Sequence, residues 1–191
     1  MKIIKLYNNE NQLIKKAAKH HRGAQQKLFD AHAPKMLSVC RRYIKDLHFA
    51  EDVMLTGFLK VFSNLKNFKF EGSFEGWVRK IMVNESISFL RKQKEICFLE
   101  DQNYSYKDYE NITNIDLDVE QVQQLIDSLP EGYRMVFVLY AVEGYKHQEI
   151  SAMLNISEST SKSQLFKARK LLQKKLNELK IYENDLLKVR R

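Results

Sequence analysis

The sequence predicts an all-α fold of two small helical domains joined by a flexible acidic linker. Only 6 glycines and 2 prolines occur in 191 residues, too few for the many tight turns of a sheet protein. Apolar residues recur at three- and four-residue steps along most of the chain, as on one face of a helix. Residues 96–120, "ICFLEDQNYSYKDYENITNIDLDVE", show no clear period and exceed an ordinary connection inside a compact domain.

The hydrophobic content and the charge of the chain limit the kinds of partner and function that the protein can have. Hydrophobic residues make up 44% of the chain, enough to bury a core, so global disorder is excluded. The formal net charge of +8 predicts an anionic partner such as nucleic acid, a membrane surface or an acidic protein. Residues 1–95 carry 19 basic and 9 acidic residues, whereas residues 96–120 carry 1 and 7. Two basic ends therefore flank an acidic middle.

The cysteines and the lengths of the apolar runs indicate the cellular compartment of the protein. Cys40 and Cys97 stand in no Cys/His cluster, so neither a metal site nor a cofactor is predicted. Two scattered cysteines fit a reducing compartment better than a disulfide framework, although a disulfide stays open. The N-terminus lacks the apolar run of a signal peptide, and no stretch approaches the length of a membrane span. We expect a cytoplasmic protein without membrane insertion.

The first domain is predicted to contain several helices and an aromatic loop. Residues 12–46 form one or two amphipathic helices, with a kink or a helix start near Pro34. A further helix begins near residues 49–52, with Glu51 and Asp52 in its first turn. The loop "NLKNFKFEGSFEGW" (64–77) precedes a helix that ends in a basic run. Its glycines, asparagines, serine and phenylalanines predict a loop with an aromatic lining.

The second domain is predicted to end in a helix-turn-helix. A helix over 147–154 is followed by a corner at Asn155, which tolerates a left-handed backbone, and by a cap at Ser157. The next helix carries six basic residues between Lys162 and Lys175 and no acid. Its inner stripe contains Ser161, where an apolar residue is expected. The alternative for this helix is a solvated lysine face of a bundle.

Four segments in order carry a resemblance to a known family. They are "AEDVMLTGFLKVFSNLKNF", "FEGWVRKIMVNESISFLRKQK", "LPEGYRMVFVLYAVEGYKHQEIS" and "LNISESTSKSQLFKARKLL". Together they resemble a bacterial RNA polymerase sigma factor of the extracytoplasmic-function (ECF) group. The resemblance implies an N-terminal extension (1–19), sigma region two (20–95), an acidic linker (96–118), sigma region four (119–178) and a basic C-terminal tail (179–191).

The resemblance also implies a function and its residues. The protein would bind core RNA polymerase, melt the minus-ten promoter element with region two and read the minus-thirty-five element with region four. The implied minus-ten contacts are Phe68, Lys69, Arg79, Lys80, Ile81, Asn84, Arg91 and Lys92. Among these, Phe68, Ile81 and Asn84 would line a pocket for a flipped base. The implied minus-thirty-five contacts are Thr160, Lys162, Ser163, Phe166, Lys167 and Arg169.

The implied partners are promoter DNA, the polymerase clamp helices and flap, and an anti-sigma factor. The residues implied on the clamp are Glu51, Asp52, Phe58, Leu59 and Phe62. For Glu51 and Asp52 a simple acidic helix start remains an equal alternative. The linker would follow the RNA exit path of the polymerase or serve only as a tether. The chain departs from the family at "MLTG" (54–57), where polar residues are usual, and at Gln164, where an arginine is common.

Two rival functions compete with an initiation factor. A stand-alone helix-turn-helix transcriptional regulator would explain residues 145–176, but it gives no reason for the aromatic loop and the basic helix after it. An enzyme would need a nucleophile, a base or a phosphate-binding loop, and the sequence has no such constellation, so we predict no catalysis and no catalytic residue.

Overall fold

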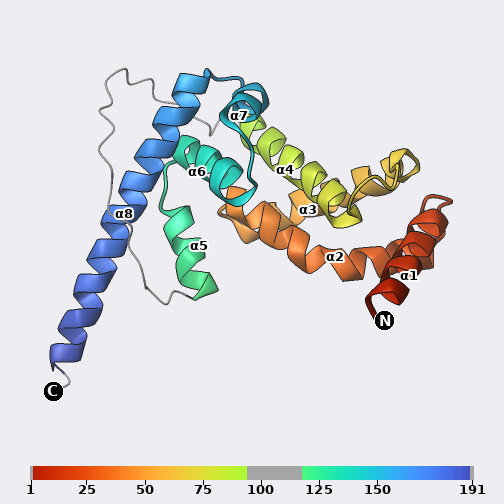
Figure 1. Cartoon of the computed structure of the whole chain (residues 1–191), viewed down its shortest axis with the longest axis horizontal. Coiled ribbons are helices and arrows are strands. Elements are labelled where there is room, and N and C mark those ends of the chain that lie inside the picture. Colours follow the sequence, from red (N-terminus) through yellow and green to blue (C-terminus); the bar gives the residue numbers. More distant parts are fainter. Residues whose placement is uncertain (1, 94–117, 190–191) are drawn as a thin grey trace. The chain divides into compact units, whose positions relative to one another are not determined.

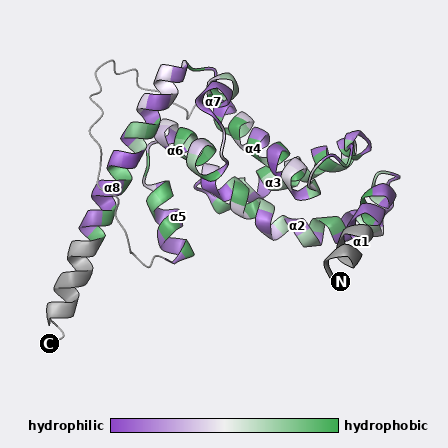
Figure 2. Cartoon of the chain, in the orientation of Figure 1, coloured by the Kyte–Doolittle hydropathy of each residue, from purple (hydrophilic) through white to green (hydrophobic). Residues whose placement is uncertain are grey.

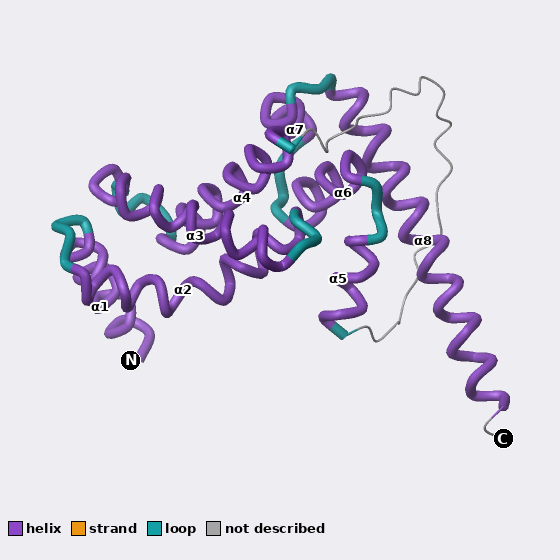
Figure 3. Tube along the Cα trace, turned by 180° about the vertical axis from the view of Figure 1, so that it is seen from behind, coloured by secondary structure: helices purple, strands orange, loops and turns teal. Residues whose placement is uncertain are grey.

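The computed structural model describes residues 2–93 and 118–189, and all regular secondary structure in these two ranges is helical. The chain divides into two compact units, residues 1–93 and 94–191 (Figure 1). In each unit short loops join the helices (Figure 3). The predicted all-α fold is confirmed. The predicted acidic linker (96–118) lies outside the described residues, except for residue 118.

The first unit contains four α-helices. They are α1 (Lys2–Ala17), α2 (Arg22–Tyr43), α3 (Leu47–Asn64) and α4 (Phe74–Lys92), and a single 3-10 turn (Leu65–Asn67) follows α3. α2 packs against the other three, and α3 packs against α4. Hydrophobic and hydrophilic residues alternate around these helices (Figure 2), so that each helix buries one face. Met36, Val61 and Val78 are among the fully buried residues of this core.

The start of the first unit differs from the sequence interpretation. α1 lies within the segment assigned to an N-terminal extension, and its Ile14 and Ala17 are 1% and 0% exposed. These residues are thus part of the packed unit. At Pro34, of the two predicted alternatives, the structure excludes a new helix start, because α2 runs through this residue. Proline removes one helical hydrogen bond, and the packing of both sides of α2 against its neighbours keeps the helix continuous.

α3 begins earlier than predicted. Asp46 is its N-cap, and the Asp46 side chain accepts a hydrogen bond from Phe49 N at 3.0 Å. The first turn of α3 therefore contains no acidic residue, and Glu51 and Asp52 lie beyond it. The interpretation of these two acids as a helix-start signal is wrong, because the cap already satisfies the first turn from outside the helix.

Over the described residues 118–189 of the second unit, three short helices pack on one long helix. The short helices are α5 (Val119–Asp127), α6 (Glu131–Phe137) and α7 (His147–Leu154), and the long one is α8 (Glu158–Val189). A π-helical turn, Val138–Val142, extends α6, and Gly144 ends it with φ +78°. α8 continues through most of the segment assigned to a basic tail. Its Leu165 and Ala168 are buried, as the predicted inner stripe requires.

Candidate nucleic-acid interfaces

The aromatic loop of the first unit lines a cavity of about 420 Å³ that is open to solvent. The cavity lies between the loop after α3 and the first turn of α4. Its lining combines rings, charges and small polar groups: Asn67, Phe68, Lys69, Glu71, Ser73, Gly76 and Trp77. Ser73 caps α4 by accepting a hydrogen bond from Gly76 N at 3.0 Å, which fixes the loop against the helix. A pocket of this size and composition can hold a planar ligand such as a nucleobase.

Four rings support the wall of the cavity. The ring centroid of Phe68 lies 4.9 Å from that of Phe70 and 5.4 Å from those of Phe74 and Trp77. Phe74 is 3% exposed, as expected for a core residue. Trp77 is only half-buried and lines the cavity. Its place beside the loop in the sequence was the available signal for this role.

The structure brings together only part of the predicted base pocket. Phe68 lines the cavity, but Ile81 and Asn84 do not. These two residues follow Trp77 by four and seven positions, so they continue the same face of α4. Asn84 is exposed and lies about 10 Å along the helix axis from Trp77. Of the three residues predicted to line a base pocket, only Phe68 therefore lines this cavity, and Ile81 and Asn84 lie further along the same face of α4.

The predicted phosphate-binding cations of this unit are mostly accessible. Lys69, Lys80, Arg91 and Lys92 are exposed, whereas Arg79 is half-buried and interacts within the protein. Lys69 alone of this group lines the cavity. On α4, Lys80 precedes Asn84 by four positions and Arg91 follows it by seven, so both lie on the helix face that bears Asn84, whereas Arg79 does not.

The helix-turn-helix has the geometry that the sequence predicted. Asn155 adopts the left-handed conformation (φ 55°, ψ 50°) between α7 and α8. Ser157 Oγ accepts a hydrogen bond from Thr160 N at 3.0 Å and so caps α8. Asn155 performs the role usually given to glycine because its short polar side chain tolerates a positive φ. The corner therefore directs α8 away from α7 without a glycine.

One buried polar contact joins the two helices of this motif. Ser161 is 0% exposed, and its Oγ lies 2.9 Å from Nδ1 of His147. The His147 ring in turn stacks on Tyr140, with centroids 4.6 Å apart. Burial lowers the pKa of His147, and the charge of Lys162 lowers it further. The polar Ser161 therefore fits the inner stripe because α7 supplies a partner.

The outer face of α8 carries most of the predicted contacts. Lys162 and Arg169 are exposed, and Thr160, Ser163, Phe166 and Lys167 are half-buried. Tyrosine rings support two of the cations, since Lys167 Nζ lies 5.8 Å from the Tyr133 ring and the Arg169 guanidinium 5.6 Å from that of Tyr140. Gln164 is 0% exposed and belongs to the core, so the substitution noted at this position does not change the outer face.

The residues implied in polymerase binding divide between surface and core. Phe58 is 3% exposed, and its ring packs on Phe29 at 4.8 Å. Burial keeps this side chain from direct contact with a partner. Leu59 is 70% exposed, Asp52 is exposed, and Glu51 and Phe62 are half-buried. Leu55, which the sequence interpretation did not select, is 48% exposed one turn before Leu59.

No group of three or more His, Cys, Asp or Glu side chains that could hold a metal ion occurs in residues 2–93 and 118–189. Within the same ranges, no helix combines the length and the apolar character needed to cross a membrane.

Comparison with known proteins identifies the family. Residues 28–96 match Sigma-70 region 2, and residues 119–172 match Sigma-70, region 4. The ECF RNA polymerase sigma factor SigW of Bacillus subtilis is 28% identical over 179 residues, covering 87% of this chain and 96% of the relative. The ECF RNA polymerase sigma-E factor of Escherichia coli strain K12 is 26% identical over 181 residues, covering 87% and 94%.

A solved structure shares the fold. It is the sigma factor RpoE in complex with the anti-sigma factor NepR from Bartonella quintana, with 20% sequence identity and a TM-score of 0.51, covering 80% of this chain and 96% of that chain.

The chain belongs to the ECF group of RNA polymerase sigma factors, in the sigma-70 family. It directs transcription initiation through regions 2 and 4, and sigma factors are non-catalytic subunits of RNA polymerase. Core RNA polymerase is therefore the partner that the family implies.

Proposed function

We propose that the first unit melts the minus-ten promoter element by holding an unstacked base in the cavity between the aromatic loop and α4. Removing a base from a duplex costs a few kcal/mol, about what stacking on aromatic side chains returns. Phe68 and Trp77 supply the rings, and Glu71 supplies an acceptor for the amino group of a base. This cavity is the observation that carries the proposal.

The strand would continue from the cavity along α4. Ile81 and Asn84 lie on the helix face that leads away from Trp77, and Asn84 offers both a donor and an acceptor to a base edge. The cations proposed to bind the phosphates of this strand are Lys69, Arg79, Lys80, Arg91 and Lys92.

The second unit would read the minus-thirty-five element with the outer face of α8. Lys162, Ser163 and Phe166 lie in the first turns of the recognition helix, which enters the major groove in helix-turn-helix proteins. Lysine and serine can bond base edges, and a ring can contact a thymine methyl group. Thr160, Lys167 and Arg169 would bind phosphates and fix the register of the helix on the duplex.

The exposed face of α3 would dock on the polymerase clamp. Asp52, Leu59 and Leu55 are exposed there, and Glu51 and Phe62 are partly accessible. We propose that Phe58 acts from the core by supporting this face. The same face and α8 are available to an anti-sigma factor, a class of partner with which the structural relative RpoE was crystallised. As a polymerase subunit the protein would act in the cytoplasm.

The domain limits that follow are also proposals. Region two would cover residues 20–95, with α1 packed on it in place of a separate extension (1–19). The acidic linker would cover 96–118, and region four 119–178.

Run-off transcription with core RNA polymerase on a genomic promoter library tests the proposal. We expect new transcripts that require the chain, and strong loss of these transcripts with Asn84→Ala, Glu71→Ala or Lys162→Ala. Two controls remove similar groups elsewhere. Gln26→Ala removes an exposed amide of α2, and Lys174→Ala removes an exposed cation about 18 Å along α8 from Lys162. Transcripts unaffected by the three site variants would contradict the assignment.

A further inference from the structure

We propose that α1 and the tip of the aromatic loop form a second contact for single-stranded DNA beside the cavity. Phe70 would stack on a base adjacent to the one in the cavity, and Lys15 and Lys19 would bind the phosphates of that segment. The inference rests on the function proposed for the first unit and extends it to α1. α1 lies outside residues 28–96, which match region 2.

The backbone of the loop turns the Phe70 ring outward. Phe70 has φ 60°, and Gly72 follows with φ +101°. A bulky residue in the left-handed region costs about 1–3 kcal/mol, and such conformations cluster at binding sites. The Phe70 ring is therefore 41% exposed, and its centroid lies 4.9 Å from that of the Phe68 ring. Its exposed surface thus continues the aromatic wall of the cavity to the outside.

Packing holds α1 next to this ring. Ile14 and Ala17 are buried, which fixes one face of α1 against α2. Glu10 also binds the buried His32 of α2, with Oε1 3.0 Å from Nε2. The opposite face presents Lys15, whose Nζ lies 5.7 Å from the centroid of the Phe70 ring. A cation therefore stands over the ring at a defined place.

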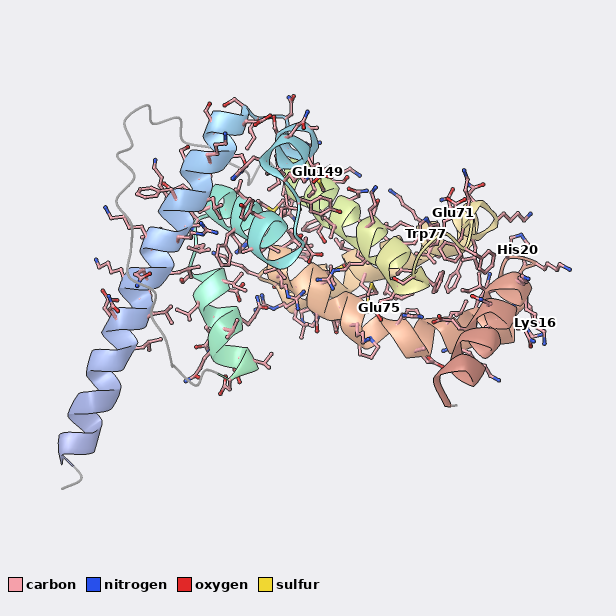
Figure 4. All side chains as sticks on the ribbon, in the orientation of Figure 1. Lys16, His20, Glu71, Glu75, Trp77 and Glu149 are labelled. Atoms are coloured by element: carbon pink, nitrogen blue, oxygen red, sulfur yellow. The ribbon has the colours of Figure 1, made fainter. Side chains whose placement is uncertain are left out.

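Further cations lie near Lys15 in the sequence. Residues 11–29 contain five Lys and Arg residues and no acid. Lys15 and Lys16, near the C-terminal end of α1, suit the helix dipole, but Arg22 begins α2, where a positive charge is unfavourable. Local helix stability therefore accounts for Lys15 and Lys16 but not for Arg22. In Figure 4, Lys16 and His20 lie at the same end of the unit as Glu71 and Trp77.

Phe70, Lys15 and Lys19 are called the rim of the cavity here, and their chemistry favours binding of a single strand over binding of a duplex. Aromatic rings beside a cationic track are the means by which proteins bind unstacked nucleic acid without strong sequence preference. In a duplex the faces of the bases are stacked on one another and cannot reach Phe70. Glu71, on the cavity side, repels phosphates, so the backbone of the strand would lie on the α1 side of the ring.

Fluorescence anisotropy of the full-length chain tests the inference with two probes. The probes are a fluorescein-labelled 12-nucleotide single strand of randomised sequence and a random-sequence duplex of the same length. We expect Phe70→Ala to weaken single-strand binding at least five-fold and duplex binding less than two-fold. Phe70→Tyr should restore single-strand binding. Phe49→Ala is the control. It removes a ring that is 46% exposed and whose centroid lies 5.6 Å from that of Phe89, so its exposure and its ring contact match those of Phe70.

A second pair of variants tests the cations. Lys15→Gln/Lys19→Gln should reduce the slope of log K against log salt by about 1.4 for the single strand, corresponding to two lost phosphate contacts. Lys35→Gln/Lys45→Gln removes the same charge from exposed positions of the same unit and should leave the slope unchanged. Circular dichroism melting checks that each variant folds.

The outcomes separate this inference from the function on which it rests. Equal single-strand affinity for Phe70→Ala and Phe49→Ala, or equal slopes for the two lysine pairs, would overturn the second contact even if the chain starts transcription. A loss of polymerase binding without a loss of single-strand binding would assign the rim to a protein partner and would overturn it as well. Failure of the wild-type chain to start transcription with core polymerase would instead count against the proposed function.

Discussion

His147 Nδ1 and Ser161 Oγ lie 2.9 Å apart and join the two helices of the helix-turn-helix by a hydrogen bond. The contact connects the first residue of α7 to a fully buried position of the recognition helix. Because Ser161 directly precedes Lys162, the bond bears on the direction in which the outer face of α8 points.

A double-mutant cycle measures this bond. Ser161→Ala removes the buried hydroxyl, and we expect it to destabilise the second unit by about 1 kcal/mol, as for other buried hydrogen bonds. In a His147→Ala background the same change should cost less, because the partner is already absent. Hydrogen exchange of α8 amides reports the stability of this unit separately from the first. Additive effects of the two substitutions would show that the bond contributes nothing.

The titration of His147 should depend on Lys162. Burial and the charges of Lys162 and Arg169 lower the pKa of His147 below its ordinary 6.5, while Glu158 acts in the opposite direction. The histidine of the unfolded chain binds a proton more readily than His147 of the folded chain, so protonation favours unfolding. The stability that neutral His147 gives the fold is therefore complete above pH 6.5 and is lost as the pH falls through the lowered pKa. Titration followed by NMR should show a higher His147 pKa in Lys162→Gln than in the wild type. Identical titrations would exclude the electrostatic contribution of Lys162.

The sequence was most informative where a local rule decides the structure. Asn155 and Ser157 were predicted correctly because a left-handed corner and an N-cap depend on residue types that are adjacent in the chain. The predicted start of α3 was wrong because Asp46, and not the acids at 51–52, caps the helix. The cavity could be predicted only in part, since its shape depends on how the loop approaches the first turn of α4, which residue spacing does not determine.

Gly57 shows how a tertiary contact can reverse a local rule. Helix propensity alone predicts that Gly57→Ala stabilises α3 by about 1 kcal/mol. A Cβ at this buried position would, however, lie within 2.9 Å of Cε of Met82 on α4. The end of a methionine is flexible, but Met82 is 0% exposed, so it can move only by displacing other core side chains. We expect Gly57→Ala to destabilise the first unit by about 1–3 kcal/mol in urea unfolding, as for other overpacked cores. Thr56→Ala, at an exposed neighbouring position, should have little effect, and a stabilised Gly57→Ala would disprove close packing here.

Cys40 should be inert as long as the first unit is folded. Burial raises the pKa of its thiol to about 11, despite a hydrogen bond with Ser86 that acts in the opposite direction. At pH 8 only about one thiol in a thousand would be ionised. In a Cys97→Ser background we expect labelling by a thiol reagent to follow the rate of unfolding and to rise steeply in urea. Rapid stoichiometric labelling of the native protein would contradict the buried position.

Leu55 and Leu59 should contribute to polymerase binding without supporting the fold. Both are exposed on α3, by 48% and 70%, one helical turn apart. Burial of two leucines in an interface is worth a few kcal/mol at most, so Leu55→Ala/Leu59→Ala should weaken binding to core polymerase at least ten-fold. The urea midpoint should not change, because neither side chain is in the core. Leu179→Ala removes a leucine of α8 that is 38% exposed and serves as the control. A double variant that binds core polymerase as tightly as this control would move the docking surface away from α3.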